Sequence, residues 1–404
     1  IIEMENLNMV CQCIDIDNET TIEEILAECF VDMPLRKIAL RKHKRYKEEL
    51  TICNLKEFQQ TPITIRKDGI YLIAGGLGAI GLEVAGVLAL QGAAHLIMLN
   101  RHEIPPRNKW NIILEKREDL LQCDLIEKIR LIEATGAKVH CFSVDISVQF
   151  QVDNVLKEIH SSFGQINGVI HSAGLGFGHV GHKIVEDQTE KFETEAAPKI
   201  EGTWILDHAT RKDNLDFFVI FSSPVTVTGG VGVGSYIIGN AFQSAYAAYR
   251  NKLGFHTIAV AWAPWNHTIQ KLGQNYRQEQ QLFMPLSNFH AMECLKKIVS
   301  LKADEIMVGQ LNGTSKLFQL KELLPFSYSE QVRNRIQNIS EPVEMLQHEA
   351  PNLEEVKLFG CMHDQYLPLE KQIAQVWARV FNLITLSIDD NYYELGGDSI
   401  IAIT

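Results

Sequence analysis

Short apolar runs alternate with longer amphipathic segments through the middle of the chain, from residue 69 to residue 262. The apolar runs have the length of buried strands, and the segments between them have the length and spacing of helices. Strands that alternate with helices form a parallel sheet covered on both faces, so the pattern predicts a doubly wound α/β fold of the Rossmann type. Strands are expected at 70–73, 95–99, 139–144, 168–171, 216–221 and 256–262, and helices at 80–90, 119–134, 152–163, 189–210 and 235–253.

The segments on either side of this unit have other patterns. Residues 1–66 mix strand-like and helix-like stretches, and we interpret them as the remnant of an accessory structural subdomain that precedes a catalytic domain at 67–325. Residues 326–366 are polar and proline-containing, which favours a linker or a small packing segment. A new helix pattern begins at residue 367, so 367–404 is expected to be part of a further domain. With no initiating methionine and an end inside an expected helix, the chain is expected to be a piece of a longer polypeptide.

Composition narrows the classes of partner. The 404 residues carry a formal net charge of -12 and contain no long basic run, which argues against nucleic acid or an anionic membrane as a main partner. No apolar run reaches the roughly 18 residues of a membrane span, and the first residues do not have the layout of a signal peptide. The eight cysteines form no C-x-x-C pair. We therefore expect reduced thiols, no metal site and a cytoplasmic location.

A glycine-rich turn follows the first expected strand. Gly76, Gly78 and Gly81 form the pattern G-x-G-x-x-G at the start of the next helix. Glycine allows a tight turn and a close approach of the backbone to a pyrophosphate, and the helix N-terminus presents free N–H groups to the phosphates. Together with Ile80, these glycines are predicted to bind a dinucleotide cofactor.

The end of the second expected strand indicates which dinucleotide is bound. An NAD site usually has an acid here to hold the ribose hydroxyls, whereas the sequence reads Leu99-Asn100-Arg101. The planar guanidinium of Arg101 can pair with a 2′-phosphate, which favours NADPH. Asp145, after the third strand, and Ala173-Gly174, after the fourth, are further candidate cofactor contacts.

A serine and a tyrosine that could take part in the reduction of a carbonyl follow the fifth expected strand. Ser223 follows the fifth expected strand, Tyr236 lies near the start of the next helix, and Asn240 is one helical turn further on the same face. Reduction of a carbonyl needs an acid near its oxygen, and a tyrosine serves when a nearby cation lowers its pKa. These residues are therefore candidate catalytic residues.

The arrangement resembles the short-chain dehydrogenase/reductase superfamily, and within it the modular ketoreductases of polyketide and peptide synthases. In those enzymes asparagine stands four residues after the tyrosine and the catalytic lysine comes from the preceding helix, which Lys199 matches. The resemblance covers about residues 35–325 and implies catalytic roles for Lys199, Ser223, Tyr236 and Asn240. Residues 176–178 and Thr228 match neither of the family's two stereochemical patterns, so the product configuration stays open. Further matching motifs are Ile38-Ala39-Leu40-Arg41 with Arg45-Tyr46, Val169–Gly174 and Ala261–Trp265.

The last residues resemble a carrier-protein motif. Leu395-Gly396-Gly397-Asp398-Ser399-Ile400 is similar to the phosphopantetheine attachment site of peptidyl carrier domains. The resemblance implies that Ser399 accepts phosphopantetheine from a phosphopantetheinyl transferase.

These observations lead to one favoured function and two alternatives. We expect NADPH-dependent reduction of a carrier-bound α-ketoacyl thioester in a depsipeptide-forming nonribosomal peptide synthetase, because the carrier motif is peptidyl. Adenylation and condensation domains are then the expected neighbours. The alternatives are reduction of a β-ketoacyl thioester in a polyketide synthase and a catalytically silent scaffold.

Overall fold

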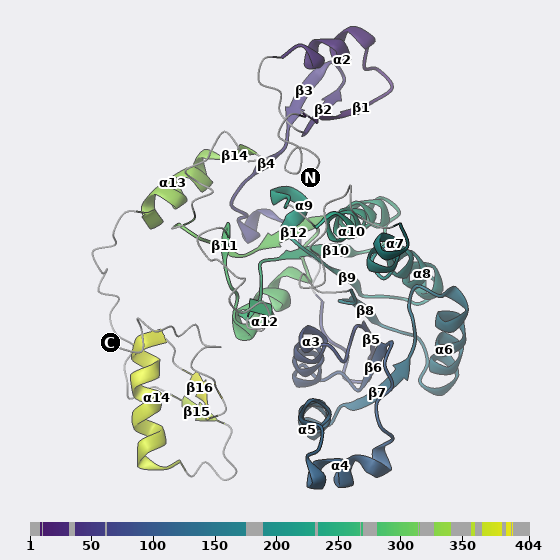
Figure 1. The fold of residues 1–404 in the computed structure, drawn as a ribbon, viewed down its shortest axis with the longest axis vertical. Coiled ribbons are helices and arrows are strands. Elements are labelled where there is room, and N and C mark those ends of the chain that lie inside the picture. The colour runs from purple at the N-terminus through teal and green to yellow at the C-terminus, as the bar shows by residue number, and fades with distance from the viewer. Residues whose placement is uncertain are drawn as a thin grey trace.

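A seven-stranded parallel sheet forms the centre of the computed structural model (Figure 1). The strand order is β12-β10-β9-β8-β5-β6-β7. The order reverses between β5 and β8, and in such sheets ligands bind at the carboxyl ends of the strands beside this point. The strands are β5 (Ile70–Ala74), β6 (His95–Asn100), β7 (Lys138–Ser143), β8 (Gly168–His171), β9 (Phe217–Ser222), β10 (Thr257–Trp262) and β12 (Glu305–Val308). The structure describes residues 9, 11–31, 37–60, 63–174, 189–230, 233–266, 268–269, 281–313, 315, 327–340, 357–359, 366–381, 385–388 and 390.

Helices cover both faces of the sheet. On one face α3 (Ala79–Leu90), α5 (Leu120–Ala134) and α12 (Asn288–Ile298) pack into a large apolar cluster (Figure 1). On the other face α6 (Gln149–Ser162), α8 (Glu201–Thr210) and α10 (Gly234–Lys252) pack into a second cluster. Strands β5, β8, β9 and β10 are buried along their whole length, which explains their continuous apolar sequence.

The predicted doubly wound fold is confirmed, and all six expected strands agree with the structure to within one residue at each end. The single helix expected at 189–210 is wrong. The chain forms α7 (Thr189–Ala196) and then α8, with a turn around Pro198 between them. Proline disfavours the helical conformation of the residue before it, which explains the break. The seventh strand, the helix α12 and the short helices η2 (Arg107–Lys109) and α4 (Trp110–Lys116) were not expected from the sequence pattern.

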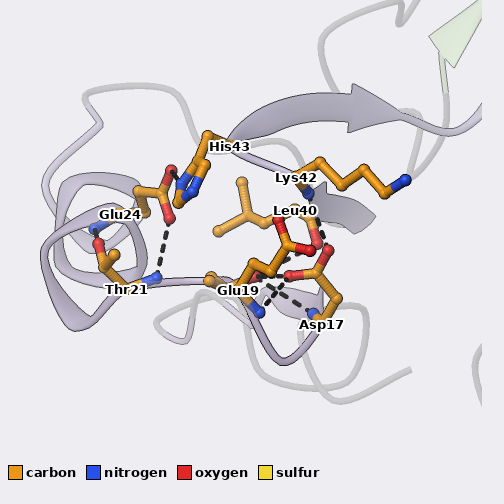
Figure 2. Close-up of polar contacts among 8 residues, drawn as sticks. Asp17, Glu19, Thr21, Glu24, Leu40, Lys42 and His43 are labelled. Carbon is orange, nitrogen blue, oxygen red and sulfur yellow. Dashed lines mark hydrogen bonds and ion pairs between the residues drawn. The ribbon is translucent and has the colours of Figure 1, made fainter.

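The N-terminal residues form a small separate sheet. Strand β1 (Cys13–Ile16) pairs in parallel with β2 (Lys37–Arg41) after the helix α2 (Ile22–Cys29), and β2 turns back into β3 (Lys44–Lys47). The hairpin tip has two non-glycine residues with positive φ, Lys42 at 49° and His43 at 57°. Figure 2 shows how these two residues are held from the preceding loop and helix. The Asp17 carboxylate accepts from the Lys42 N–H at 2.8 Å, and Glu24 contacts the His43 ring at 3.0 Å.

Residues 327–340 pack against elements that precede and form the central domain. Strand β14 (Ser327–Tyr328) pairs with β4 (Glu49–Leu50), and Val332 and Ile336 of α13 (Glu330–Ser340) are buried in the larger apolar cluster. A separate apolar cluster joins α14 (Pro368–Phe381) to β15 (Lys357–Phe359) and β16 (Thr385–Ser387). The remaining elements are η1 (Leu55–Glu57), α9 (Val225–Thr228), β11 (Phe283–Met284) and β13 (Gln310–Leu311).

Candidate active site

The glycine-rich turn links β5 to α3 at the carboxyl end of the sheet. Gly75 has a φ of 80°, and a Cβ on it would lie 2.8 Å from the backbone of Ala173. A Cβ on Gly81 would lie 2.3 Å from the Gly75 carbonyl oxygen, so the first turn of α3 can approach the loop only with glycine here. Gly76 lies against Met98. These contacts keep the helix N-terminus, which Gly78 caps, open toward the end of the sheet.

A cleft of about 170 Å³ opens beside this turn. Five of the predicted cofactor residues line it, which brings together loops that follow four different strands. Gly76 and Gly81 shape the turn from behind, while Ile80 packs partly buried against the larger apolar cluster, outside the lining of the cleft. The predicted residues in the lining are Gly78, Arg101, Asp145, Ala173 and Gly174, and the other lining residues are Gly75, Leu99, Asn100, His102, Val144, Ile146, Ser172 and Pro198.

The lining of the cleft combines small residues with charged and polar side chains. The small lining residues are Gly75, Gly78, Ser172, Ala173 and Gly174. Arg101 is exposed at the rim of the cleft, and the Ser143 hydroxyl holds the loop by donating to the Arg101 carbonyl oxygen at 3.1 Å. The Asp145 carboxylate accepts from the Ser147 N–H at 2.9 Å, which fixes the third loop.

Lys199 is buried between the cleft and the helix α10. Its ammonium donates to the Phe221 carbonyl oxygen at 3.1 Å and to the Gln243 side-chain oxygen at 2.9 Å. Its stem runs past two glycines, and a Cβ on Gly174 or Gly239 would lie 3.0 Å from it. Burial lowers the pKa of Lys199 to about 7, because the interior disfavours the charged form.

Tyr236, Ser223 and Asn240 meet beside Lys199. The Lys199 Nζ atom lies 5.8 Å from the centre of the Tyr236 ring. Burial raises the pKa of the Tyr236 phenol, and hydrogen bonds with the side chains of Ser223 and Asn240 oppose this rise. The Asn240 amide nitrogen also donates to the Tyr236 carbonyl oxygen at 2.7 Å, one helical turn back. The four predicted catalytic residues are therefore brought together.

The tertiary structure adds residues that the sequence pattern did not single out. Gln243 contacts Lys199 directly, and its position seven residues after Tyr236 on one helix face was the available indication. His171 is fully buried, and its Nε2–H donates to the Pro198 carbonyl oxygen at 3.0 Å. Burial lowers the pKa of His171 to about 3, so it is neutral. Asn100, His102, Ser172 and Pro198 line the cleft.

Some predicted features cannot be compared with the structure. Ser399 and residues 176–178 lie outside the described residues. Within the part of the chain that is described, no cluster of three metal-ligating side chains occurs. None of the described helices is long and apolar enough to cross a membrane.

Comparison with known proteins identifies the central segment. The family model of the KR domain matches residues 69–267. The 6-methylsalicylic acid synthase of Aspergillus terreus is 38% identical over 208 residues, which are 51% of this chain and 11% of that protein. The mellein synthase of Phaeosphaeria nodorum is 32% identical over 201 residues, 50% of this chain and 11% of its own length. The chain thus spans about a tenth of the length of these curated relatives.

Solved structures agree with this assignment. An N-terminal ketoreductase from the macrolactin assembly line is 25% identical, with a TM-score of 0.62 over 80% of this chain and 60% of the other. A multidomain structure of a keto acid-selecting NRPS module, with adenylation, ketoreductase and pseudo Asub domains, shares the fold at 22% identity and a TM-score of 0.65, over 79% of this chain and 26% of that one. Residues 69–267 therefore match the KR-domain family, and this segment is a ketoreductase domain, an oxidoreductase, similar to those of the synthases and assembly lines named above.

Proposed function

We propose that the domain reduces the ketone of a carrier-bound ketoacyl thioester with NADPH. The observation that carries the proposal is the meeting of Tyr236, Ser223 and Lys199 next to the glycine-lined cleft. A site that only positioned neighbouring domains would have no need of a buried lysine beside a buried tyrosine. We therefore propose a catalytic function in place of a catalytically silent scaffold.

The cofactor is proposed from the fit of the cleft. The turn at Gly76–Gly81 and the α3 N-terminus would hold the pyrophosphate, and Arg101 would pair with the 2′-phosphate. Asp145, Ala173 and Gly174 line the same cleft. NADPH, when bound, supplies the hydride that reduces the ketone carbon.

The chain's own residues deal with the ketone oxygen. The Tyr236 hydroxyl donates the proton that this oxygen needs as it gains negative charge, and the Ser223 hydroxyl donates a hydrogen bond to it. The Lys199 ammonium lies beside the phenol ring and stabilises the tyrosinate that remains after proton transfer. Asn240 anchors the start of α10 by bonding back to the Tyr236 carbonyl oxygen.

Two substrate classes fit this chemistry, and we propose the α-ketoacyl thioester. The peptidyl type of the motif at 395–400 supports it, and the shared fold with the ketoreductase of a keto acid-selecting NRPS module is in keeping with it. The β-ketoacyl thioester is the second candidate, because structures of the same fold include ketoreductases of modular polyketide synthases. In either case Ser399 is proposed to carry phosphopantetheine. For the α-ketoacyl substrate, adenylation and condensation domains are the proposed neighbours.

A competition between matched substrates tests the proposal. The α- and β-ketoacyl thioesters of one branched acid, each on the same carrier, are reduced with NADPH, and kcat/KM is compared by mass spectrometry of the hydroxyacyl products. The ketone moves by one carbon relative to the thioester, about 1.5 Å, and a misplacement of that size can lower the rate about 10²-fold. Preference for the β-ketoacyl thioester would assign the domain to a polyketide synthase. If neither thioester is reduced, the proposed reaction is contradicted.

A further inference from the structure

The buried ammonium of Lys199 is held by neutral acceptors. Phe221 contributes a backbone carbonyl oxygen and Gln243 a side-chain oxygen, at 3.1 and 2.9 Å. Within the described part of the chain, Lys199 forms no ion pair with a carboxylate, and burial is the single cause of its lowered pKa. A buried ammonium depends on each acceptor to which it donates, since the loss of one leaves a buried donor without a partner. The Gln243 oxygen is therefore a large part of what keeps this lysine charged and in place.

A closed ring of hydrogen bonds fixes the orientation of the Gln243 amide. The Thr203 hydroxyl donates to the Lys199 carbonyl oxygen at 2.5 Å and so has only lone pairs left to offer. The Gln243 amide nitrogen donates to that hydroxyl at 3.2 Å, which turns the amide oxygen toward the Lys199 ammonium. The Thr203 and Gln243 side chains are fully buried. A flipped amide would set two acceptors against each other at Thr203 and two donors at Lys199.

One face of α10 presents several of the groups that surround the lysine. Tyr236, Asn240 and Gln243 follow one another at spacings of four and three residues, so they share one stripe of the helix. Gly239 lies on this stripe as well, and the missing side chain makes room for the Lys199 stem. One rigid helix therefore sets the distance between the tyrosine and the lysine.

We propose that Gln243 is a positioning residue of the reductase, which holds the Lys199 ammonium beside Tyr236 by accepting its hydrogen bond. The inference rests on the proposed function, in which Lys199 and Tyr236 are catalytic. Gln243 itself bonds to Lys199 and Thr203 and acts through the lysine. Its contribution is measurable as the pH at which the lysine loses its proton.

Two substitutions at residue 243 are expected to move the pH profile in opposite directions. Gln243→Met keeps the length of the side chain and removes the acceptor, which lowers the pKa of Lys199. The decline of kcat/KM at alkaline pH (the alkaline limb) should therefore move to lower pH by about one pH unit or more. Gln243→Glu keeps an acceptor oxygen and adds negative charge, so the limb should move to higher pH. The assay follows NADPH oxidation with a ketoacyl N-acetylcysteamine thioester. A purely structural residue would lower the rate at every pH without shifting the limb.

Two further variants separate this effect from general damage to α10. Thr203→Val removes the group that orients the amide and leaves Gln243 in place, so it should shift the limb in the direction of Gln243→Met, and less far. Tyr246→Phe removes a hydrogen bond of the same helix to Asp207, at 2.7 Å, and should leave the limb at the wild-type pH. Should Gln243→Met fail to fold, Gln243→Glu and Thr203→Val still make opposite predictions.

The outcomes distinguish this inference from the proposed function. An unmoved limb in folded Gln243→Met, Gln243→Glu and Thr203→Val, with Lys199→Met inactive, would overturn the role of Gln243 alone. A wild-type profile with no alkaline limb would overturn it too. Full turnover by Lys199→Met would instead overturn the proposed catalytic set.

Discussion

The Lys199 ammonium and the Tyr236 ring, which come from different elements of the chain, lie 5.8 Å apart inside the protein. Lys199 follows the turn at Pro198, and Tyr236 is on the first turn of α10. Both groups are buried, and each pKa is moved by burial, that of the lysine downward and that of the phenol upward. Burial alone would bring both groups toward their neutral forms at neutral pH. The charge state of the pair therefore depends on the hydrogen bonds that surround it.

Tyr236→Phe should lower kcat for reduction by about 10²–10⁴-fold, because it removes the proton donor. The affinity for NADPH should stay near the wild-type value, since Tyr236 is not part of the cleft lining. Steady-state kinetics gives the first quantity, and fluorescence titration with NADPH gives the second. Tyr249→Phe, on the exposed side of the same helix, is the matched control. Full turnover by Tyr236→Phe would contradict the assignment.

Arg101→Ala should raise the KM for NADPH much more than the KM for NADH. The two cofactors differ in the 2′-phosphate, to which the guanidinium at the rim of the cleft is proposed to bind. Arg130→Ala removes an exposed arginine of α5 that bonds to Asn111 at 2.5 Å, and should change neither value. An equal loss for both cofactors would show that Arg101 does not select NADPH.

Lys199→Met should stabilise the cofactor-free protein while abolishing its activity. The unfolded lysine keeps its proton up to about pH 10.5, and the folded one loses it near pH 7. Between these values the unfolded chain binds more protons, so wild-type stability rises with pH in this window, and the full cost of the buried charge is present below pH 7. Each tenfold change in the proton affinity of the lysine corresponds to about 1.4 kcal/mol.

Thermal melts from pH 6 to pH 10 measure this effect. The melting temperature of Lys199→Met should exceed that of the wild type most at pH 6, and the difference should shrink as the pH rises through the window. Lys252→Met, at the C-terminal end of α10, should give no such trend. A difference that does not depend on pH would mean that the folded Lys199 keeps an ordinary pKa.

Ser399 should accept one phosphopantetheine group in a polypeptide that contains the whole carrier domain. Intact mass after treatment with a phosphopantetheinyl transferase and coenzyme A measures the addition, and Ser399→Ala should prevent it. Ser387→Ala, in β16 of the same region, should still be modified. Modification of Ser399→Ala would place the attachment site elsewhere.

The sequence determined the fold class and the place of the glycine turn, because both depend on local order along the chain. Buried parallel strands leave continuous apolar runs, and the glycine turn lies at a strand-to-helix junction that the same runs define. The spacing of Tyr236 and Asn240 is one helical turn, so their proximity follows from the helix itself. Pro198 also indicates the break between α7 and α8, although the apolar pattern of 189–210 favoured a single helix.

Only the tertiary structure decided what surrounds the lysine. Thr203, Gln243 and Lys199 come from two helices and the turn between α7 and α8, and their hydrogen bonds link residues up to 44 positions apart in the chain. The same holds for the cleft, where residues after β5, β6, β7 and β8 meet because parallel strands end at one edge of the sheet. No pattern of apolar and polar positions in the sequence singles out a glutamine such as Gln243, since its role depends on which buried donor faces its side chain. Packing between elements, which local sequence does not encode, determines that partner.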